Sequence, residues 1–302
     1  MIKEALYYEK IDKDTVMCKL CPHFCKITCG NSGLCIPRKA VRNENKDTIL
    51  INTNYEAITS IAIDPIEKKP LYNFYPDTNI LSVGTFGCNF KCSFCQNYNI
   101  SQQEVQHQTV SSKELVDAIL NIPNNIGIAF TYNEPFIWYE YILETVKLLK
   151  ESDNNKKVVL VTNGYVNEEP LKNIIPYIDA MNIDLKGDER YYKSLCKGSL
   201  EPVLKTIEIA YKYGVHIEVT TLLVTDENTN EENIIGIREF LSGLDNNIPI
   251  HISRYFPRYK YTSESTSLEV IKRAYNILRE KLNYVYIGNV SEEERKYIIS
   301  NN

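Results

Sequence analysis

From Ile80 onward, the chain alternates between short apolar segments and longer segments whose apolar residues recur at helical spacing. The short segments predict six strands, at residues 80–86, 126–132, 157–163, 180–186, 215–224 and 248–256. The longer segments predict helices in SSKELVDAIL, PFIWYEYILETVKLL, EEPLKNIIPYI, LEPVLKTIEIAYKYG, NEENIIGIREFLSGL and SLEVIKRAYNILREKL. Repeated βα units of this kind indicate an α/β fold with a parallel sheet. The pattern does not distinguish a doubly wound sheet from an open barrel.

Polar residues collect where the predicted strands end. They follow successive strands as TFGCN, TYNEP, TNG, DLKG and SRYFPRYK. Both architectures carry their chemistry at the carboxyl ends of the parallel strands. We therefore expect one active-site mouth that is built from these segments.

The first 80 residues have a different character. Five cysteines lie between Cys18 and Cys35, and the closely spaced prolines of IDPIEKKPLYNFYP predict an irregular segment that wraps around the rest. We therefore divide the chain into a cysteine-rich metal-binding and wrapping module at residues 1–79 and a core domain at residues 80–302.

The composition indicates which partners the protein can bind and in which cellular compartment it works. Lys and Arg total 34 against 39 Asp and Glu, a net charge of −5, so the chain has no overall basic field for nucleic acid. No apolar run approaches the roughly 20 residues that span a bilayer, and MIKEALYYEK lacks a signal-peptide core, so we expect a cytoplasmic protein. Eight of the nine cysteines precede residue 96, and their tight spacing favours metal ligation in a reducing compartment over disulfides.

Three cysteines, Cys88, Cys92 and Cys95, follow the first predicted strand with the spacing CxxxCxxC. Cysteine thiolates hold iron–sulfur clusters, and three ligands on a cubane of four irons leave one iron open to a substrate. Zinc in a structural site would take a fourth ligand, and the remaining alternative is three buried thiols without metal. The regular spacing in a loop at the expected mouth favours a [4Fe-4S] cluster.

This loop resembles the signature of the radical SAM enzymes. The resemblance implies a partial, open six-stranded βα barrel and S-adenosylmethionine (SAM) bound at the open iron. It also implies reductive cleavage of SAM to methionine and a 5′-deoxyadenosyl radical that abstracts hydrogen. The segments TYNEP, VTNGY, MNIDLKG, LEPVL, HIEVTTLLV, HISRYFPRYK and YIGNV, with CKLCPHFCKITCGNSGLC, further resemble the AmmeMemoRadiSam-system proteins, relatives of pyruvate formate-lyase-activating enzymes.

Matched position by position, the resemblance implies a set of residues around SAM. The cofactor-binding candidates are Phe94, Thr131, Asn133, Glu134, Asn163, Asp184, Lys186, His251 and Arg254, and the catalytic candidates are Lys186 and Cys196. Structural roles compete with these assignments. Glu134 suits a helix N-terminus, Asp184 with Lys186 could form an ordinary ion pair, and Cys196 could be a small buried residue.

The N-terminal stretch is too short to bury all of its cysteines as hydrophobic residues, so metal is expected there as well. The expected ligands are Cys18, Cys21, Cys25 and Cys35, with Cys29 as a substitute. Four-thiolate zinc and an auxiliary iron–sulfur cluster can both use these cysteines, and the sequence does not separate them. We expect this module to bind its metal independently of SAM chemistry.

The resemblance to activating enzymes implies a radical SAM enzyme that abstracts hydrogen from a macromolecule, with a glycine Cα–H of a partner protein as the first hypothesis. The implied partners are a flavodoxin or ferredoxin as electron donor, Memo-like and AMMECR-like proteins, and a glycyl-radical protein. The alternative is modification of RNA or of a small molecule, for which Arg254, Arg258 and Lys260 with nearby aromatic residues could bind phosphates and bases. A hypothesis of a different class is a zinc-binding scaffold without catalysis.

Overall fold

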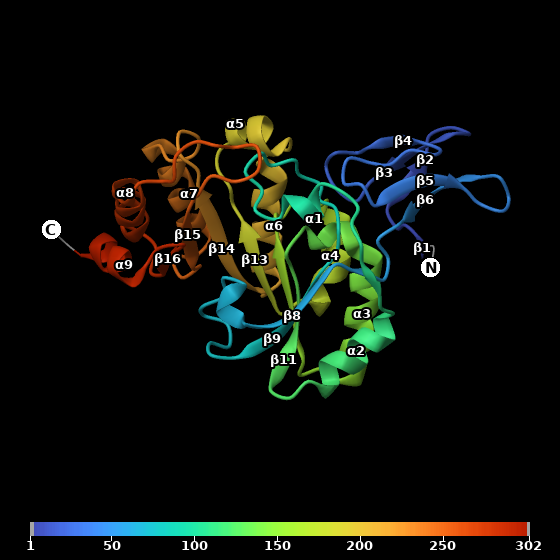
Figure 1. Cartoon of the computed structure of the whole chain (residues 1–302), viewed down its shortest axis with the longest axis horizontal. Helices are drawn as coiled ribbons and strands as arrows, with labels where there is room; N and C mark the ends of the chain where they lie inside the picture. The colour runs from blue at the N-terminus through green and yellow to red at the C-terminus, as the bar shows by residue number, and fades with distance from the viewer. Residues whose placement is uncertain (1–2, 301–302) are drawn as a thin grey trace.

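The structure is a computed structural model that describes residues 3–300. Its centre is one eight-stranded sheet with the order β16–β15–β14–β13–β12–β11–β9–β8 (Figure 1). The strands are β8 (Ser60–Pro65), β9 (Asn79–Gly84), β11 (Asn125–Phe130), β12 (Lys157–Thr162), β13 (Ala180–Asp184), β14 (His216–Leu223), β15 (Ile250–Arg254) and β16 (Val285–Gly288). All of them pair in parallel except β8, which pairs antiparallel with β9. The six predicted strands are present in chain order, and the predicted α/β fold is confirmed.

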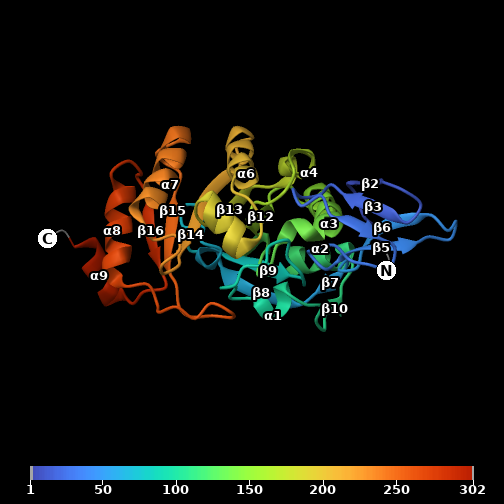
Figure 2. The ribbon, with the colours of Figure 1, turned by 90° about the horizontal axis from the view of Figure 1, so that it is seen from above.

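Helices follow the strands of this sheet in the order that the periodicity predicts. They are α2 (Ser112–Asn121), α3 (Tyr139–Ser152), α4 (Glu168–Ile174), α6 (Glu201–Lys212), α7 (Glu231–Leu244) and α8 (Leu268–Arg279), joined by the unpredicted α1 (Tyr98–Ser101), α5 (Glu189–Tyr191) and α9 (Glu292–Ile299). The helices α4, α6 and α7 stand along one face in Figure 2. Because helices cover the sheet, the strands are nearly continuous apolar runs. Within residues 3–300, no helix has both the length and the apolarity that a membrane crossing requires.

Two strands extend the sheet beyond the six that the sequence predicts. At one edge β16 adds a seventh parallel strand. At the other edge β8 pairs with β9, so residues 60–65 belong to the main sheet although the sequence division places them in the N-terminal module. The side chains of Ile61 and Ile63 on β8 are 52% and 54% exposed, so this strand shows its apolar residues to solvent. Apolar residues normally mark the buried face of a strand, and here they are exposed. For this reason the pattern of residues 60–65 did not predict a strand of the main sheet.

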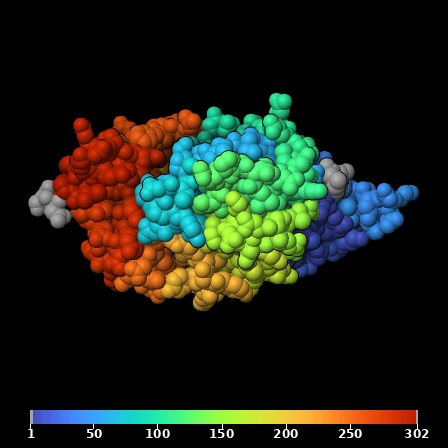
Figure 3. All heavy atoms as spheres, turned by 90° about the horizontal axis from the view of Figure 1, so that it is seen from below, coloured from blue at the N-terminus to red at the C-terminus, as the bar shows by residue number. Residues whose placement is uncertain are grey.

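Two small antiparallel sheets precede the main sheet. One pairs β1 (Lys3–Glu4), β6 (Thr48–Asn52) and β5 (Arg38–Arg42), and the other pairs β2 (Tyr8–Lys10), β3 (Thr15–Cys18) and β4 (Lys26–Thr28). A further short pair joins β7 (Ala57–Ile58) to β10 (Gln108–Thr109). In Figures 1 and 3 the N-terminal segments (blue) and the C-terminal helices (red) lie at opposite ends of the molecule.

The amino ends of the strands are closed by the segment that follows β8. The buried Glu218 carboxylate on β14 accepts hydrogen bonds from the backbone N–H of Tyr72 (3.0 Å) and of Asn73 (2.7 Å). The same carboxylate lies 3.0 Å from His216 Nε2 and 2.6 Å from His251 Nε2. Burial alone would raise the pKa of Glu218, but the hydrogen bonds from the two histidines and from the backbone lower it to about 2.

We expect Glu218→Gln to weaken this closure and to change the acid sensitivity of the protein. A carboxylate whose pKa is lowered from 4.5 to about 2 stabilises the folded state above pH 4.5, and this stability is lost as the pH falls toward 2. The full effect corresponds to about 3 kcal/mol. Urea unfolding of the wild type and the variant at pH 7, 5 and 3 measures it, and the difference between them should shrink on acidification. A constant difference would contradict this role of the carboxylate.

Candidate functional site

The three cysteines of the CxxxCxxC segment lie in the loop between β9 and α1, at the carboxyl ends of the parallel strands. The side chain of Asn133 anchors this loop, since its Oδ1 accepts from the backbone N–H of Thr85 (3.2 Å) and its Nδ2 donates to Gly87 O (2.8 Å). Gly87 has φ +91°, and a Cβ there would lie 2.4 Å from the carbonyl oxygen of Cys35. Only glycine fits this close approach between the loop and the N-terminal segment.

Each of the three thiols has a defined polar neighbour. The Sγ of Cys88 accepts from the backbone N–H of Phe90 (3.3 Å), and the Sγ of Cys95 lies 3.2 Å from Ser101 Oγ. Cys92 has Cys196 as its neighbour. Burial raises the pKa of Cys88 and of Cys95, whereas the interaction with Cys196 and then burial raise that of Cys92. A metal would therefore have to displace the protons when it binds.

The donor set suits an iron–sulfur cluster. In a cubane each thiolate binds a different iron, so three thiolates leave one iron open. Cys88, Cys92 and Cys95 lie on one loop at the carboxyl ends of the strands and are the residues that could hold such a cluster. Within residues 3–300, no group of three or more His, Cys, Asp or Glu side chains is already arranged to hold one metal ion.

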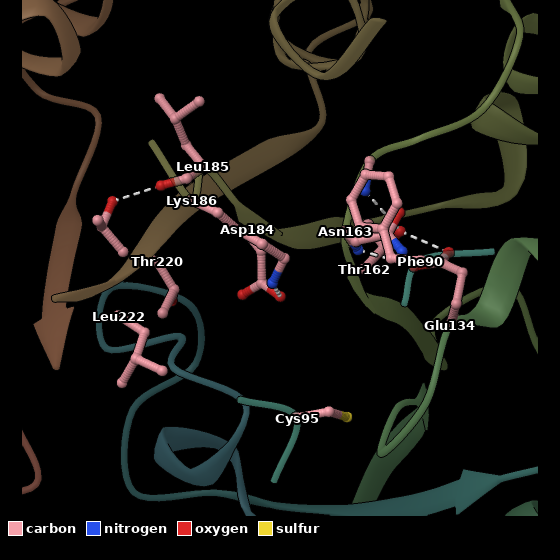
Figure 4. A network of polar contacts seen from close by, with 12 residues as sticks. Phe90, Cys95, Glu134, Thr162, Asn163, Asp184, Leu185, Lys186, Thr220 and Leu222 are labelled. Atoms are coloured by element: carbon pink, nitrogen blue, oxygen red, sulfur yellow. Dashed lines mark hydrogen bonds and ion pairs between the residues drawn. The ribbon is translucent and has the colours of Figure 1, made fainter. Parts of the chain in front are cut away.

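The TYNEP segment after β11 is bound tightly to the next strand. The Glu134 carboxylate accepts from the backbone N–H of Phe136 (2.9 Å), from Thr162 Oγ1 (2.7 Å) and from the backbone N–H of Asn163 (2.8 Å) (Figure 4). It caps the short helix Pro135–Trp138, so the helix-terminus role considered for it is confirmed. Burial raises the pKa of Glu134 to about 7, against these hydrogen bonds.

The TNG segment after β12 reaches the cysteine loop directly. The Nδ2 of Asn163 donates to Asn89 Oδ1 (2.8 Å) and lies 3.7 Å from Cys88 Sγ. Asn89 also donates from Nδ2 to Tyr165 O (2.7 Å). The sequence analysis did not identify Asn89, and its place directly after the first cysteine of the loop was the only signal.

The DLKG segment after β13 carries an ion pair at the same mouth. Lys186 Nζ lies 2.6 Å from Asp184 Oδ2, so the predicted pair exists. Burial opposes the charge of Lys186, but the Asp184 carboxylate and the nearby thiols raise its pKa well above the usual value. In Figure 4 the Asp184 carboxylate, Asn163 and Cys95 border the same central space.

Phe94, Thr131 and His251 contact residues outside the segments described above. Phe94 is buried, with its ring centroid 5.7 Å from that of Tyr191. Thr131 donates its backbone N–H to Val83 O (2.9 Å), beside β9. His251 contacts Glu218 at the closed amino end of the sheet, as described above.

Arg254, at the end of β15, lies 2.9 Å from a carboxylate oxygen of Glu294 and donates from Nε to Thr266 O (2.8 Å). In the structure, His251 and Arg254 each contact a carboxylate of the protein itself. Their assignment to SAM stays a prediction.

Cys196 lies in a π-helical turn, Tyr192–Cys196, and is fully buried. Its carbonyl oxygen accepts from the backbone N–H of Lys91 (2.8 Å), within the cysteine loop. A Cβ at Gly198 would lie 2.3 Å from the ring of Phe90, so this turn packs closely against the loop. The turn that carries Cys196 therefore lies directly on the cysteine loop, and π-helical turns of this kind are frequent at functional sites.

Comparison with known proteins agrees with this geometry. The Radical SAM superfamily matches residues 82–241. An uncharacterized protein of Methanocaldococcus jannaschii is 42% identical over 299 residues, 97% of this chain and 87% of that protein. The pyruvate formate-lyase-activating enzyme of Clostridium pasteurianum is 23% identical over 169 residues, 53% of this chain and 68% of that enzyme.

Among solved structures, a radical SAM methyltransferase from Sphaerobacter thermophilus shares the fold with a TM-score of 0.53 at 18% identity, over 84% of this chain and 78% of that one. More than half of the chain thus matches the superfamily, and the cysteine loop lies within the matched region. Reductive cleavage of SAM is general to this superfamily. The chain belongs to the Radical SAM superfamily.

Proposed function

We propose that Cys88, Cys92 and Cys95 hold a [4Fe-4S] cluster, and that the protein uses SAM to abstract a hydrogen atom from a glycine of a partner protein. The observation that carries the first half is the loop of three free thiols at the carboxyl ends of the strands. When bound, the cluster supplies the electron that cleaves SAM and so produces the hydrogen-abstracting radical.

The residues around the loop would orient SAM. In this proposal the Lys186 ammonium pairs with the carboxylate of SAM, while Asp184 holds that ammonium in place at 2.6 Å. Thr131, Asn133 and Glu134 provide the wall on the side of the methionyl amino group, and Asn163 provides the edge toward the ribose. Asn133 and Asn163 already bind the cysteine loop, so they would couple the position of SAM to that of the cluster.

Cys196 has a role beside the cluster in this proposal. Cys196 is buried and its interaction with Cys92 raises the pKa of that thiol, which suits a group that tunes the cluster through a ligand. An electron donor of the flavodoxin or ferredoxin class would supply the reducing equivalent.

The proposal of a protein substrate is supported by the similarity to a pyruvate formate-lyase-activating enzyme. Glycine is a suitable target because it lacks a side chain and accepts unusual backbone angles, so a strand that carries it can enter a buried site. Memo-like and AMMECR-like proteins and glycyl-radical proteins are the candidate partners.

Anaerobically reconstituted protein, supplied with dithionite and SAM, should form 5′-deoxyadenosine, which chromatography measures. Addition of the correct partner should then give a glycyl-radical signal by electron paramagnetic resonance. Formation of 5′-deoxyadenosine without a glycyl radical on any candidate would favour RNA or a small molecule as the substrate. Zinc at the loop with no SAM cleavage would instead support the non-catalytic scaffold.

A further inference from the structure

Four thiols of the N-terminal segment line one cavity, which Asn89 of the cysteine loop also borders. The lining includes Cys18, Cys21, Cys25 and Cys35, and the other walls are mostly apolar. The cavity measures about 10 Å³. A space of this size suits a single ion.

The backbone brings these cysteines together from two turns. Cys18 ends β3 and donates its N–H to Cys25 O (3.0 Å), while Phe24 N–H bonds Cys21 O (3.2 Å), which closes the first turn. A second turn, closed by the bond from Ile36 N–H to Gly33 O (3.0 Å), presents Cys35. All of these thiols are free of disulfides.

A buried cation at the same cavity is an independent sign of a missing ligand. Arg38 lines the cavity, its side chain is fully buried, and its Nε–H is a buried donor without a partner. Its other nitrogens are used, since Nη2 binds Glu140 (2.8 Å) and Nη1 binds Leu6 O (3.0 Å). A buried donor left unpaired is costly, so an acceptor beside it is expected.

We propose that Cys18, Cys21, Cys25 and Cys35 bind one zinc ion in a closed, four-thiolate site. As they stand, the thiols line the cavity walls and form no ready-made ligand group within residues 3–300, so each sulfur turns inward about its Cα–Cβ bond when the ion binds. The sulfurs then lie about 2.3 Å from zinc, and the four thiol protons go to solvent. The site carries a net charge of −2, which gives the Arg38 Nε–H its missing acceptor.

Such a site would also fix the loop that holds the three catalytic-site cysteines. The carbonyl oxygen of Cys35 lies against Gly87, and His23, which lines the same cavity, has Nε2 2.7 Å from Asn89 O. Cys88 stands between those two contacts. The N-terminal module therefore packs directly on the loop.

The test compares Cys18→Ser/Cys21→Ser with the matched control Cys29→Ser in the full chain. Cys29 belongs to the same segment but does not line the cavity. The wild type and the control should contain one zinc per chain by elemental analysis, and the double variant should lose at least nine-tenths of it. Loss of zinc from the control, or full zinc in the double variant, would overturn the ligand set.

X-ray absorption on the intact protein keeps the proposal testable if the double variant fails to fold. We expect four sulfur neighbours at about 2.3 Å from zinc. Nitrogen or oxygen neighbours, or an absence of zinc together with iron and sulfide beyond one cluster, would refute the assignment. None of these readouts depends on SAM cleavage, so the zinc site can fail while the proposed activity stands.

Discussion

Replacement of Cys88, Cys92 and Cys95 by Ala should lower the reductive cleavage of SAM by about a thousandfold or more, to the background of the reductant. The reason is that the three thiols are the proposed protein ligands of the cluster, and the loop offers no substitute beside them except Cys196, which is held in its own turn. The measurement is 5′-deoxyadenosine formed per chain, together with iron content.

The matched control for this triple variant is Cys29→Ala, which removes a thiol from the N-terminal segment without touching the loop or the four-thiol cavity. It should keep wild-type cleavage and wild-type iron. Far-ultraviolet circular dichroism confirms that the triple variant remains folded. Continued cleavage of SAM by a folded triple variant would remove the cluster from this loop.

The second large effect is expected at the ion pair between the N-terminal sheets and α3. Arg38 Nη2 contacts both carboxylate oxygens of Glu140, at 2.8 and 3.0 Å, and both side chains are at most 1% exposed. The carboxylate also accepts from Leu6 N–H (2.8 Å) and Asn52 Nδ2 (2.8 Å). Glu140→Gln removes the carboxylate charge that pairs with the buried Nη2 of Arg38, which should lower the free energy of unfolding by about 3–5 kcal/mol.

Glu168→Gln is the control, because it removes one partner of an exposed pair with Lys172, where little change in the free energy of unfolding is expected. Urea unfolding gives the free energies, and limited proteolysis should show earlier cutting of the N-terminal sheets in Glu140→Gln alone. Equal stability of the two variants would mean that water or a rearranged partner compensates for the lost charge.

Local sequence patterns predicted the strands, the long helices and the cysteine loop, because the residues that define each of them lie close together along the chain. Each predicted strand is an apolar run because both faces of the parallel sheet are covered. Each long helix is recognisable because its apolar residues recur with the helical period. The cysteine loop was equally visible, because its ligand spacing is set within eight residues of one turn, from Cys88 to Cys95.

Positions of individual side chains around the mouth were less predictable. The sequence named Glu134 and Asp184, and the structure places both at the carboxyl ends of the strands. It did not reveal that His251 points to Glu218, because that carboxylate comes from the neighbouring strand and is fixed by backbone groups near residue 72, far away along the chain.

Tertiary structure alone decided how the N-terminal segment meets the main sheet. The contact of His23 with Asn89 spans 66 residues and that of Arg38 with Glu140 spans 102, and neither leaves a periodic trace in the sequence. The edge strand β8 was hidden for a related reason, since its exposed Ile61 and Ile63 reverse the usual pattern. Sequence periodicity reports which residues a chain buries, whereas the partner of each buried polar group depends on how distant segments pack together.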